Sequence, residues 1–198
     1  MRLNMLEVKR QLLHITIGFV TLILIIWGIL TPLILFLIIV FSAVLSILSK
    51  RYRIPIVSWF LENFEREKEK SRFPGRGFIS FFVGVLLATK LFEQNIAYAS
   101  IMILTLGDSI SHMVGIHLGR IRNPLNGIKS IEGNLAGGLA GFMGAIFFVN
   151  PWLAGIGSFG AMLIEAIQVK MNETIVDDNI IVPLVAGAII TLARSLIF

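Results

Sequence analysis

Long apolar segments recur along almost the whole chain, and they constrain its fold more than any other feature. Of the 198 residues, 56% are hydrophobic and only 15% are charged, which lies outside the usual range of soluble domains. A helix needs roughly 17 to 25 mostly apolar residues to cross the hydrocarbon core of a bilayer. The sequence therefore predicts an all-α, polytopic membrane helix bundle that forms a single domain over residues 1–198.

About seven such segments can be marked off between polar clusters. Between the second and the third, residues 54–76 change from apolar to highly charged, which predicts either a cytoplasmic interfacial helix followed by a charged loop or a solvated connector. In this region Glu62 and Arg66 have the spacing of an ion pair on one helix face. The first segment is longer than the core of a signal peptide, so we expect it to be retained. The segments are Leu12–Leu30, Pro32–Leu48, Gly77–Phe92, Ile96–Val114, Ile131–Val149, Trp152–Val169 and Ile180–Phe198.

The basic residues are unequally divided between the two ends of these segments. With the N-terminus in the cytoplasm, 15 of the 17 Lys and Arg residues lie on the cytoplasmic side, and only Lys90 and Arg194 lie near the other face. Cationic loops stay on the cytoplasmic side during insertion, so we expect this orientation in a cell-membrane protein. The net charge of +5 then faces anionic headgroups or a cytosolic nucleotide, and we expect no nucleic-acid partner. The sequence indicates no oligomeric state.

Ionisable side chains gather at the cytoplasmic ends of several segments. Each costs on the order of 2.5 to 3.5 kcal/mol at the bilayer centre, so a cluster of them indicates a function. Asp108, Ser111 and His112 have the spacing of neighbours on one helix face, and Gly115 continues that face. In the expected topology the same membrane edge is reached by Arg10, His14, Arg120, Lys129, Glu132, Glu165, Asp177, Asp178 and Asn179.

Acids mixed with Lys, Arg and Gly suit a nucleotide phosphate bound through Mg²⁺. Carboxylate oxygens hold the hard cation, and a basic side chain neutralises charge as a phosphoryl group moves. Structural roles stay open for the same residues, since Asp108 can pair with Arg120 or Lys129, and Glu165 with Lys170. The absence of cysteine excludes thiolate chemistry.

Glycine is frequent in the fifth and sixth segments. Gly133, Gly137 and Gly141 recur every four residues and predict a smooth face for close helix packing. The sequence GIGSFG, Gly155–Gly160, matches a dinucleotide-binding pattern only formally, because it lies inside an apolar segment without a preceding strand. We therefore assign most of these glycines to packing.

Several motifs resemble those of a known family. GDSISHMVG, Gly107–Gly115, followed by KSIEGNLAGG, Lys129–Gly138, resembles the paired signature of CTP-dependent polyprenol kinases and CDP-lipid cytidylyltransferases. The kinase branch includes dolichol kinase, phytol kinase and CTP-using diacylglycerol kinase. RQLLHITIGF, Arg10–Phe19, FPGRGFISFF, Phe73–Phe82, and DDNIIVP, Asp177–Pro183, are similar to elements of that branch, so the resemblance extends over nearly the whole chain.

The resemblance implies roles for individual residues in a kinase-like site that uses CTP and Mg²⁺. It implies Asp108 and Glu132 as metal ligands and Lys129 as a contact to the nucleotide phosphates. His112, Asn134 and Ile116 depart from the family pattern, and Arg120 is the candidate to replace the charge missing at Ile116. The expected catalytic set is Asp108, Lys129, Glu132, Asp177 and Asp178; the nucleotide-binding set is Gly107, Ser109, Arg120, Ser130, Gly133, Asn134 and Asn179; and Arg10, His14 and His112 lie near the lipid hydroxyl.

The resulting hypothesis is a CTP-dependent kinase for the hydroxyl of a membrane isoprenoid alcohol of the dolichol or polyprenol type. Asp177, Asp178 and His14 are alternative acceptors for the hydroxyl proton. A cytidylyltransferase that makes a CDP-activated lipid is the first rival. A small ion-coupled transporter that uses Asp108 and Glu165 is a remoter one, since internal repeats typical of transporters are not evident.

Overall fold

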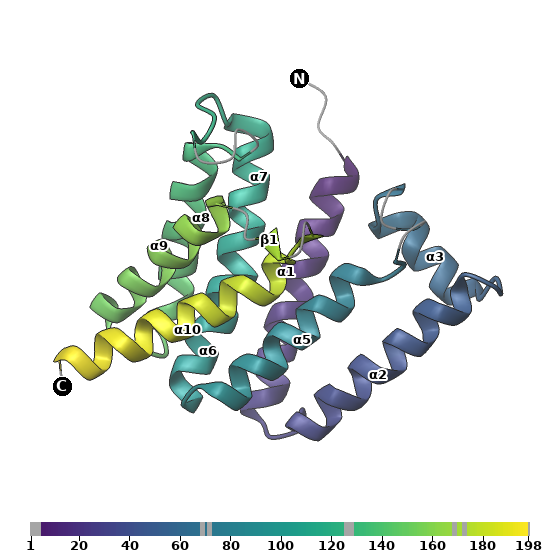
Figure 1. Ribbon diagram of the computed structural model, residues 1–198, viewed down its shortest axis with the longest axis horizontal. Coiled ribbons are helices and arrows are strands. Elements are labelled where there is room, and N and C mark those ends of the chain that lie inside the picture. The colour runs from purple at the N-terminus through teal and green to yellow at the C-terminus, as the bar shows by residue number, and fades with distance from the viewer. Residues whose placement is uncertain are drawn as a thin grey trace.

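The computed structural model describes residues 5–67, 70, 73–124, 129–167, 170–171 and 174–197, and these residues are mostly helical (Figure 1). The helices are α1 (Met5–Ile26), α2 (Pro32–Ser49), α3 (Pro55–Phe64), α5 (Arg76–Leu91), α6 (Gln94–Met102), the π-helix η1 (Ile103–Asp108), α7 (Ser109–Leu118), α8 (Ile131–Ala145), α9 (Pro151–Ile167) and α10 (Asp178–Ile197). Two short strands, β1 (Lys170–Met171) and β2 (Thr174–Ile175), pair antiparallel between α9 and α10. The predicted all-α bundle is confirmed.

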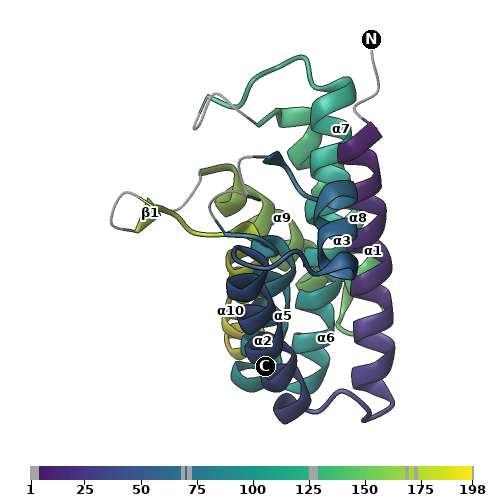
Figure 2. The same cartoon turned by 90° about the vertical axis from the view of Figure 1, so that its right-hand side faces the viewer.

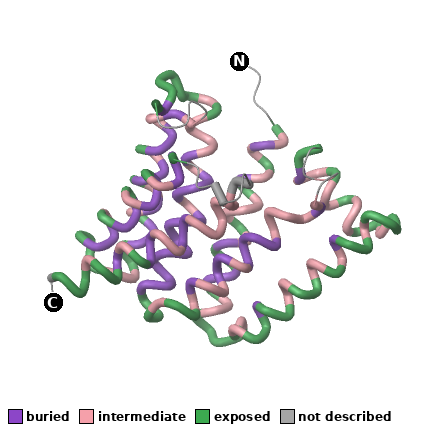
Figure 3. Tube along the Cα trace, viewed as in Figure 1, coloured by how far each residue is buried: buried purple, intermediate pink, exposed green. Residues whose placement is uncertain are grey.

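Within the described part of the chain, four helical segments are long and apolar enough to cross a membrane. They are Met5–Ile26, Pro32–Ser49, Gln94–Leu118 and Asp178–Leu196, while α9 is apolar but shorter. Buried residues concentrate in the centre of the bundle, whereas α2 exposes large apolar side chains such as Phe41 and Ile47 (Figure 3). The chain is therefore an integral membrane protein. The expected total of seven spans and the cytoplasmic N-terminus stay predictions.

The helices run back and forth, so their ends gather in two groups. One end holds the first turns of α1, α5, α8 and α10 and the last turns of α7 and α9 (Figures 1 and 2). Lys90 and Arg194 lie in the last turns of α5 and α10, at the other end, where Arg194 contacts Glu93 at 2.5 Å. These two basic residues thus lie together at the end opposite the first turns of α1, α5 and α10, and the side of the membrane that each end faces stays a prediction.

The predicted glycine face lies on α8 and contacts η1 and α7. A Cβ at Gly133 would lie 2.6 Å from the carbonyl oxygen of Ser111, and one at Gly137 would lie 2.6 Å from that of Gly107. At Gly141 a Cβ would meet Ser158 Oγ at 2.5 Å. These glycines let the α8 backbone approach its neighbours closely, as the sequence predicted.

The segment expected at the membrane surface begins with α3, in which no described residue is buried. The predicted pair between Glu62 and Arg66 is not the pair that the structure shows, because α3 ends at Phe64 and Arg66 lies beyond it. Glu62 instead lies 3.6 Å from Arg53, and Arg66 contacts Glu7 of α1 at 2.8 Å. The chain after α3 is therefore fastened to α1.

We expect Gly137→Ala to destabilise the protein by about 1 to 3 kcal/mol, because the added Cβ forces α8 away from η1 and α7. Gly155→Ala is the matched control, since its Cβ would meet the nearest atom, Phe142 Cδ2, only at 3.9 Å. Thermal unfolding of both variants in detergent measures the difference. Equal stability of the two variants would contradict the packing role.

Candidate active site

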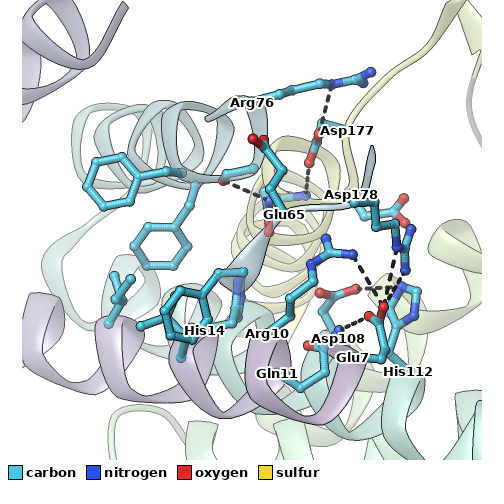
Figure 4. Close-up of a pocket in the computed structure, with 18 of the residues that line it drawn as sticks. Glu7, Arg10, Gln11, His14, Glu65, Arg76, Asp108, His112, Asp177 and Asp178 are labelled. Atoms are coloured by element: carbon cyan, nitrogen blue, oxygen red, sulfur yellow. Dashed lines mark hydrogen bonds and ion pairs between the residues drawn. The ribbon is translucent and has the colours of Figure 1, made fainter. Parts of the chain in front are cut away.

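A cavity of about 610 Å³ opens where the first turns of α1, α5 and α10 meet the end of η1 and the length of α7. Its lining includes acids, basic residues and His112, here termed the polar wall, together with apolar side chains of α1, α3 and α5, here termed the apolar wall. Figure 4 shows Arg10, His14 and Asp108 at this cavity, with Arg76 and Asp177 on its far side. Water-soluble and lipid groups can thus meet in one place.

Four potential metal ligands meet at the polar wall. One ligand atom from each of Asp108, His112, Glu165 and Asp178 lies within 4.8 Å of the others. Asp108 ends η1, His112 follows one turn later in α7, and Glu165 and Asp178 come from the facing ends of α9 and α10. Asp108 Oδ1 and Glu165 Oε2 are buried and have no hydrogen-bond partner among the described residues. Carboxylate oxygens are the ligands that Mg²⁺ prefers, so this group fits that ion.

Lys129 lies at the centre of this acidic group. Its ammonium contacts the carboxylate of Glu165 and lies 2.9 Å from Asp178 Oδ2. Burial alone would lower the pKa of the Lys129 amine, but the charges of Glu165, Asp178 and Asp108 raise that pKa above its ordinary value. Lys129 therefore stays protonated throughout the physiological pH range.

The connection between α7 and α8 holds Lys129 in place. The N–H of Asn123 donates to the Lys129 carbonyl at 2.8 Å, and the N–H of Ile131 donates to the Ile121 carbonyl at 3.0 Å. Ser130 then caps α8, since its Oγ accepts from the Gly133 N–H at 3.0 Å. Residues 121–123 thus pair antiparallel with residues 129–131, here termed the Lys129 hairpin, and α8 starts at its end.

Glu132, the second predicted metal ligand, has a different set of contacts. Its Oε1 accepts hydrogen bonds from the N–H groups of Arg120 at 3.1 Å and Ile121 at 3.0 Å. It is not a member of the acidic group above, in which Glu165 takes that place. The structure therefore supports a structural role for Glu132, and its role as metal ligand stays a prediction.

Asp177 and Asn179 connect the start of α10 to α5. Asp177 Oδ2 lies 3.2 Å from Arg76 Nε, and its Oδ1 accepts from the Asn179 N–H at 3.2 Å. The Asn179 amide donates to the Gly77 carbonyl at 3.2 Å and to Ser80 Oγ at 3.1 Å. Both residues line the cavity, yet these contacts support a positioning role for Asp177 rather than the predicted catalytic one.

The structure brings only part of the predicted site to the cavity. Its lining includes the predicted residues Arg10, His14, Asp108, His112, Lys129, Ser130, Asp177, Asp178 and Asn179. Gly107, Ser109, Gly133 and Asn134 are instead buried within the bundle. Arg120 is exposed at the end of α7, where only its backbone contact to Glu132 is described. These five are less well placed for the expected nucleotide contacts.

The set of site residues expected from the sequence does not include two acids that lie here. Glu165 was visible as an acid inside an apolar segment, but its partner is Lys129, 36 positions away, rather than the nearby Lys170 considered from the sequence. Glu7 accepts from Gln11 Nε2 at 2.9 Å and pairs with Arg66 at 2.8 Å, and all three line the cavity. No sequence signal pointed to Glu7, because the apolar segment begins only after it.

Fold and cavity together define an integral membrane helix bundle with an acidic site at one end. No family model matches the chain, and no solved structure gives a significant match. The chain is 31% identical over 194 residues to the uncharacterized protein MJ1137 of Methanocaldococcus jannaschii, covering 94% of this chain and 93% of that protein. The chain belongs to the family of that protein.

Two lipid kinases are more distant relatives. The chain is 32% identical over 139 residues to the probable phytol kinase 2, chloroplastic, of Oryza sativa subsp. japonica, covering 62% of this chain and 43% of that protein. It is 26% identical over 144 residues to the CTP-dependent diacylglycerol kinase 1 of Schizosaccharomyces pombe, covering 64% of this chain and 63% of that protein. The chain therefore spans less than two thirds of each kinase.

We expect Lys129→Met to lower the free energy of unfolding by about 3 to 5 kcal/mol, because it leaves the buried carboxylate of Glu165 without its counter-charge. The double variant Lys129→Met with Glu165→Gln should regain part of this loss. Lys90→Met, at an exposed position, is the control. Denaturant unfolding in detergent measures all three. A double variant no more stable than Lys129→Met would show that the pair does not determine stability.

Proposed function

We propose that the chain is a CTP-dependent lipid kinase that phosphorylates the hydroxyl of a membrane isoprenoid alcohol, of the dolichol or polyprenol type, at the cytoplasmic face. One observation carries this proposal: a single cavity joins a cluster of carboxylates and a buried lysine to an apolar wall. Such a cavity suits a phosphate donor from water and an acceptor from the bilayer. The similarity to two lipid kinases, one of them named as CTP-dependent, supports the choice of reaction and donor.

The polar wall would bind the donor. Asp108, Glu165 and Asp178 would hold Mg²⁺, which when bound neutralises charge on the phosphate oxygens. The Lys129 ammonium already lies among these carboxylates and would contact the phosphates as well. Because the donor site is formed before binding, its charges need little rearrangement as the phosphoryl group moves.

The apolar wall would bind the acceptor. Phe60 and Phe64 of α3 and Phe78 and Phe81 of α5 line the cavity beside α1. An isoprenoid tail can lie against these rings while its hydroxyl reaches the polar wall. The relative named as a phytol kinase supports an isoprenoid acceptor, and the basic residues around the cavity support a cytoplasmic orientation.

The position of the acids argues against a transporter. Glu165 and Asp178 lie at the ends of α9 and α10, whereas Asp108, which meets them there, lies within the longer segment Gln94–Leu118. Transporters typically place such groups near the bilayer midplane, between internal repeats. The acidic group is thus better suited to a substrate that enters from one side.

We expect the purified protein, with Mg²⁺ and a lipid alcohol, to transfer label from [γ-³²P]CTP and not from [α-³²P]CTP. Dolichol, phytol and diacylglycerol, each tested in detergent micelles, compare the acceptors. Asp108→Asn should abolish the transfer and controls for a contaminating kinase. Transfer of α label alone would identify a cytidylyltransferase and refute the kinase proposal.

We expect Glu165→Gln to raise the Mg²⁺ concentration needed for half-maximal transfer by about tenfold or more, since it removes one carboxylate from the metal-binding group. Glu132→Gln should change this concentration far less, because Glu132 bonds to the α7–α8 connection. Titration of Mg²⁺ after treatment with EDTA measures both. A larger rise in this Mg²⁺ concentration for Glu132→Gln than for Glu165→Gln would identify Glu132 as the metal ligand, as the sequence predicted.

A further inference from the structure

Transfer of a phosphoryl group to an alcohol releases the hydroxyl proton, and three side chains at the cavity could accept it. They are Asp177, Asp178 and His14, and the sequence does not distinguish them. Their contacts do. A proton acceptor needs a free lone pair that faces the acceptor site, so the existing partners of each group decide the choice.

Both aspartates already have partners. Asp177 pairs with Arg76 at 3.2 Å and accepts from the Asn179 N–H at 3.2 Å, so its carboxylate fixes the start of α10 against α5. Asp178 lies 2.9 Å from Lys129 Nζ and belongs to the metal-binding group. These contacts occupy oxygen lone pairs that a proton acceptor must keep available for the lipid hydroxyl.

His14 has the opposite surroundings. Its Nε2 is buried and has no hydrogen-bond partner among the residues that the structure describes. Its ring packs edge-on against Phe81, with centroids 5.2 Å apart and an interplanar angle of 80°. Figure 4 shows His14 on α1 one turn from Arg10, on the side of the cavity away from Asp178. The imidazole therefore lies where the apolar wall meets the polar one.

The apolar wall leads directly to this ring. Its side chains are Leu13, Ile17, Phe60, Phe64, Phe78 and Phe81, from three different helices. A hydrocarbon tail on this surface places its terminal hydroxyl beside the imidazole, with the acidic group beyond it.

We infer that His14 is the catalytic residue that accepts the proton of the lipid hydroxyl; the inference rests on the proposed function. As the hydroxyl oxygen bonds to the γ-phosphorus of CTP, the bond from that phosphorus to the β–γ bridging oxygen breaks. The hydroxyl proton moves to His14 Nε2. The products are the lipid monophosphate and CDP, and the imidazolium then releases its proton to solvent or product.

The test compares His14→Ala with His117→Ala, using phytol as acceptor and [γ-³²P]CTP as donor. His117 is a matched control, since its Nε2 is also buried without a described partner, but its Nδ1 contacts the Met113 carbonyl at 2.8 Å and it does not line the cavity. His14→Ala should lower kcat about 100-fold or more, the usual range for loss of a general base. CTP binding should stay within about twofold of wild type, and added imidazole should restore part of the rate in this variant alone.

The outcomes distinguish a failure of the role inferred for His14 from a failure of the proposed kinase function. A His14→Ala rate close to wild type, a parallel loss of CTP binding, or a loss that imidazole does not reverse overturns the role of His14 while the kinase stands. Absence of γ-label transfer by the wild-type protein to any of the three acceptors refutes the proposed function itself. Rescue by imidazole with unchanged CTP binding supports both.

Discussion

The buried ammonium of Lys129 is the interaction on which the acidic site depends. Asp108, Glu165 and Asp178 come from three helices, and their carboxylates would repel one another within 4.8 Å. Lys129 contacts two of them, Glu165 and Asp178, so its own buried charge is paired as well. Because the hairpin between α7 and α8 fixes the Lys129 backbone, one side chain joins α9 and α10 to the end of α7.

Close packing of α8 against η1 and α7 supplies the second constraint. The glycine face lets the two backbones approach, and this approach sets the position of the Lys129 hairpin relative to Asp108. The π-helix η1 ends at Asp108, directly before the regular helix that carries Ser111 and His112. A π-helical segment inside an α-helix often accompanies a functional site, and here it sets the rotation at which Asp108 meets the cavity.

Prediction from the sequence was most successful where local periodicity decides the outcome. The four long apolar helices, the glycine face and the shared face of Asp108 and His112 all follow from local sequence pattern. Prediction from the sequence was less successful for contacts between residues that are far apart in the chain. Lys129 and Glu132 belong to the same signature, yet Lys129 contacts Glu165 of α9 whereas Glu132 bonds to the α7–α8 connection. Their spacing in the sequence does not show that the two side chains have different partners.

The two walls of the cavity come from different parts of the chain, and this division suits a reaction between unlike substrates. Most apolar side chains of the cavity precede residue 82, on α1, α3 and α5, with Ile116 and Val176 as the exceptions, whereas the metal-binding group begins at Asp108. His14 belongs to the first part and lines the same cavity as the second. The contact between the proposed acceptor and donor sites therefore depends on how α1 sits against α7, and the pairing of Glu7 with Arg66 fastens α1 to the chain after α3 at this same end. Residues far from the acids in sequence thus fix the distance over which a phosphoryl group would move.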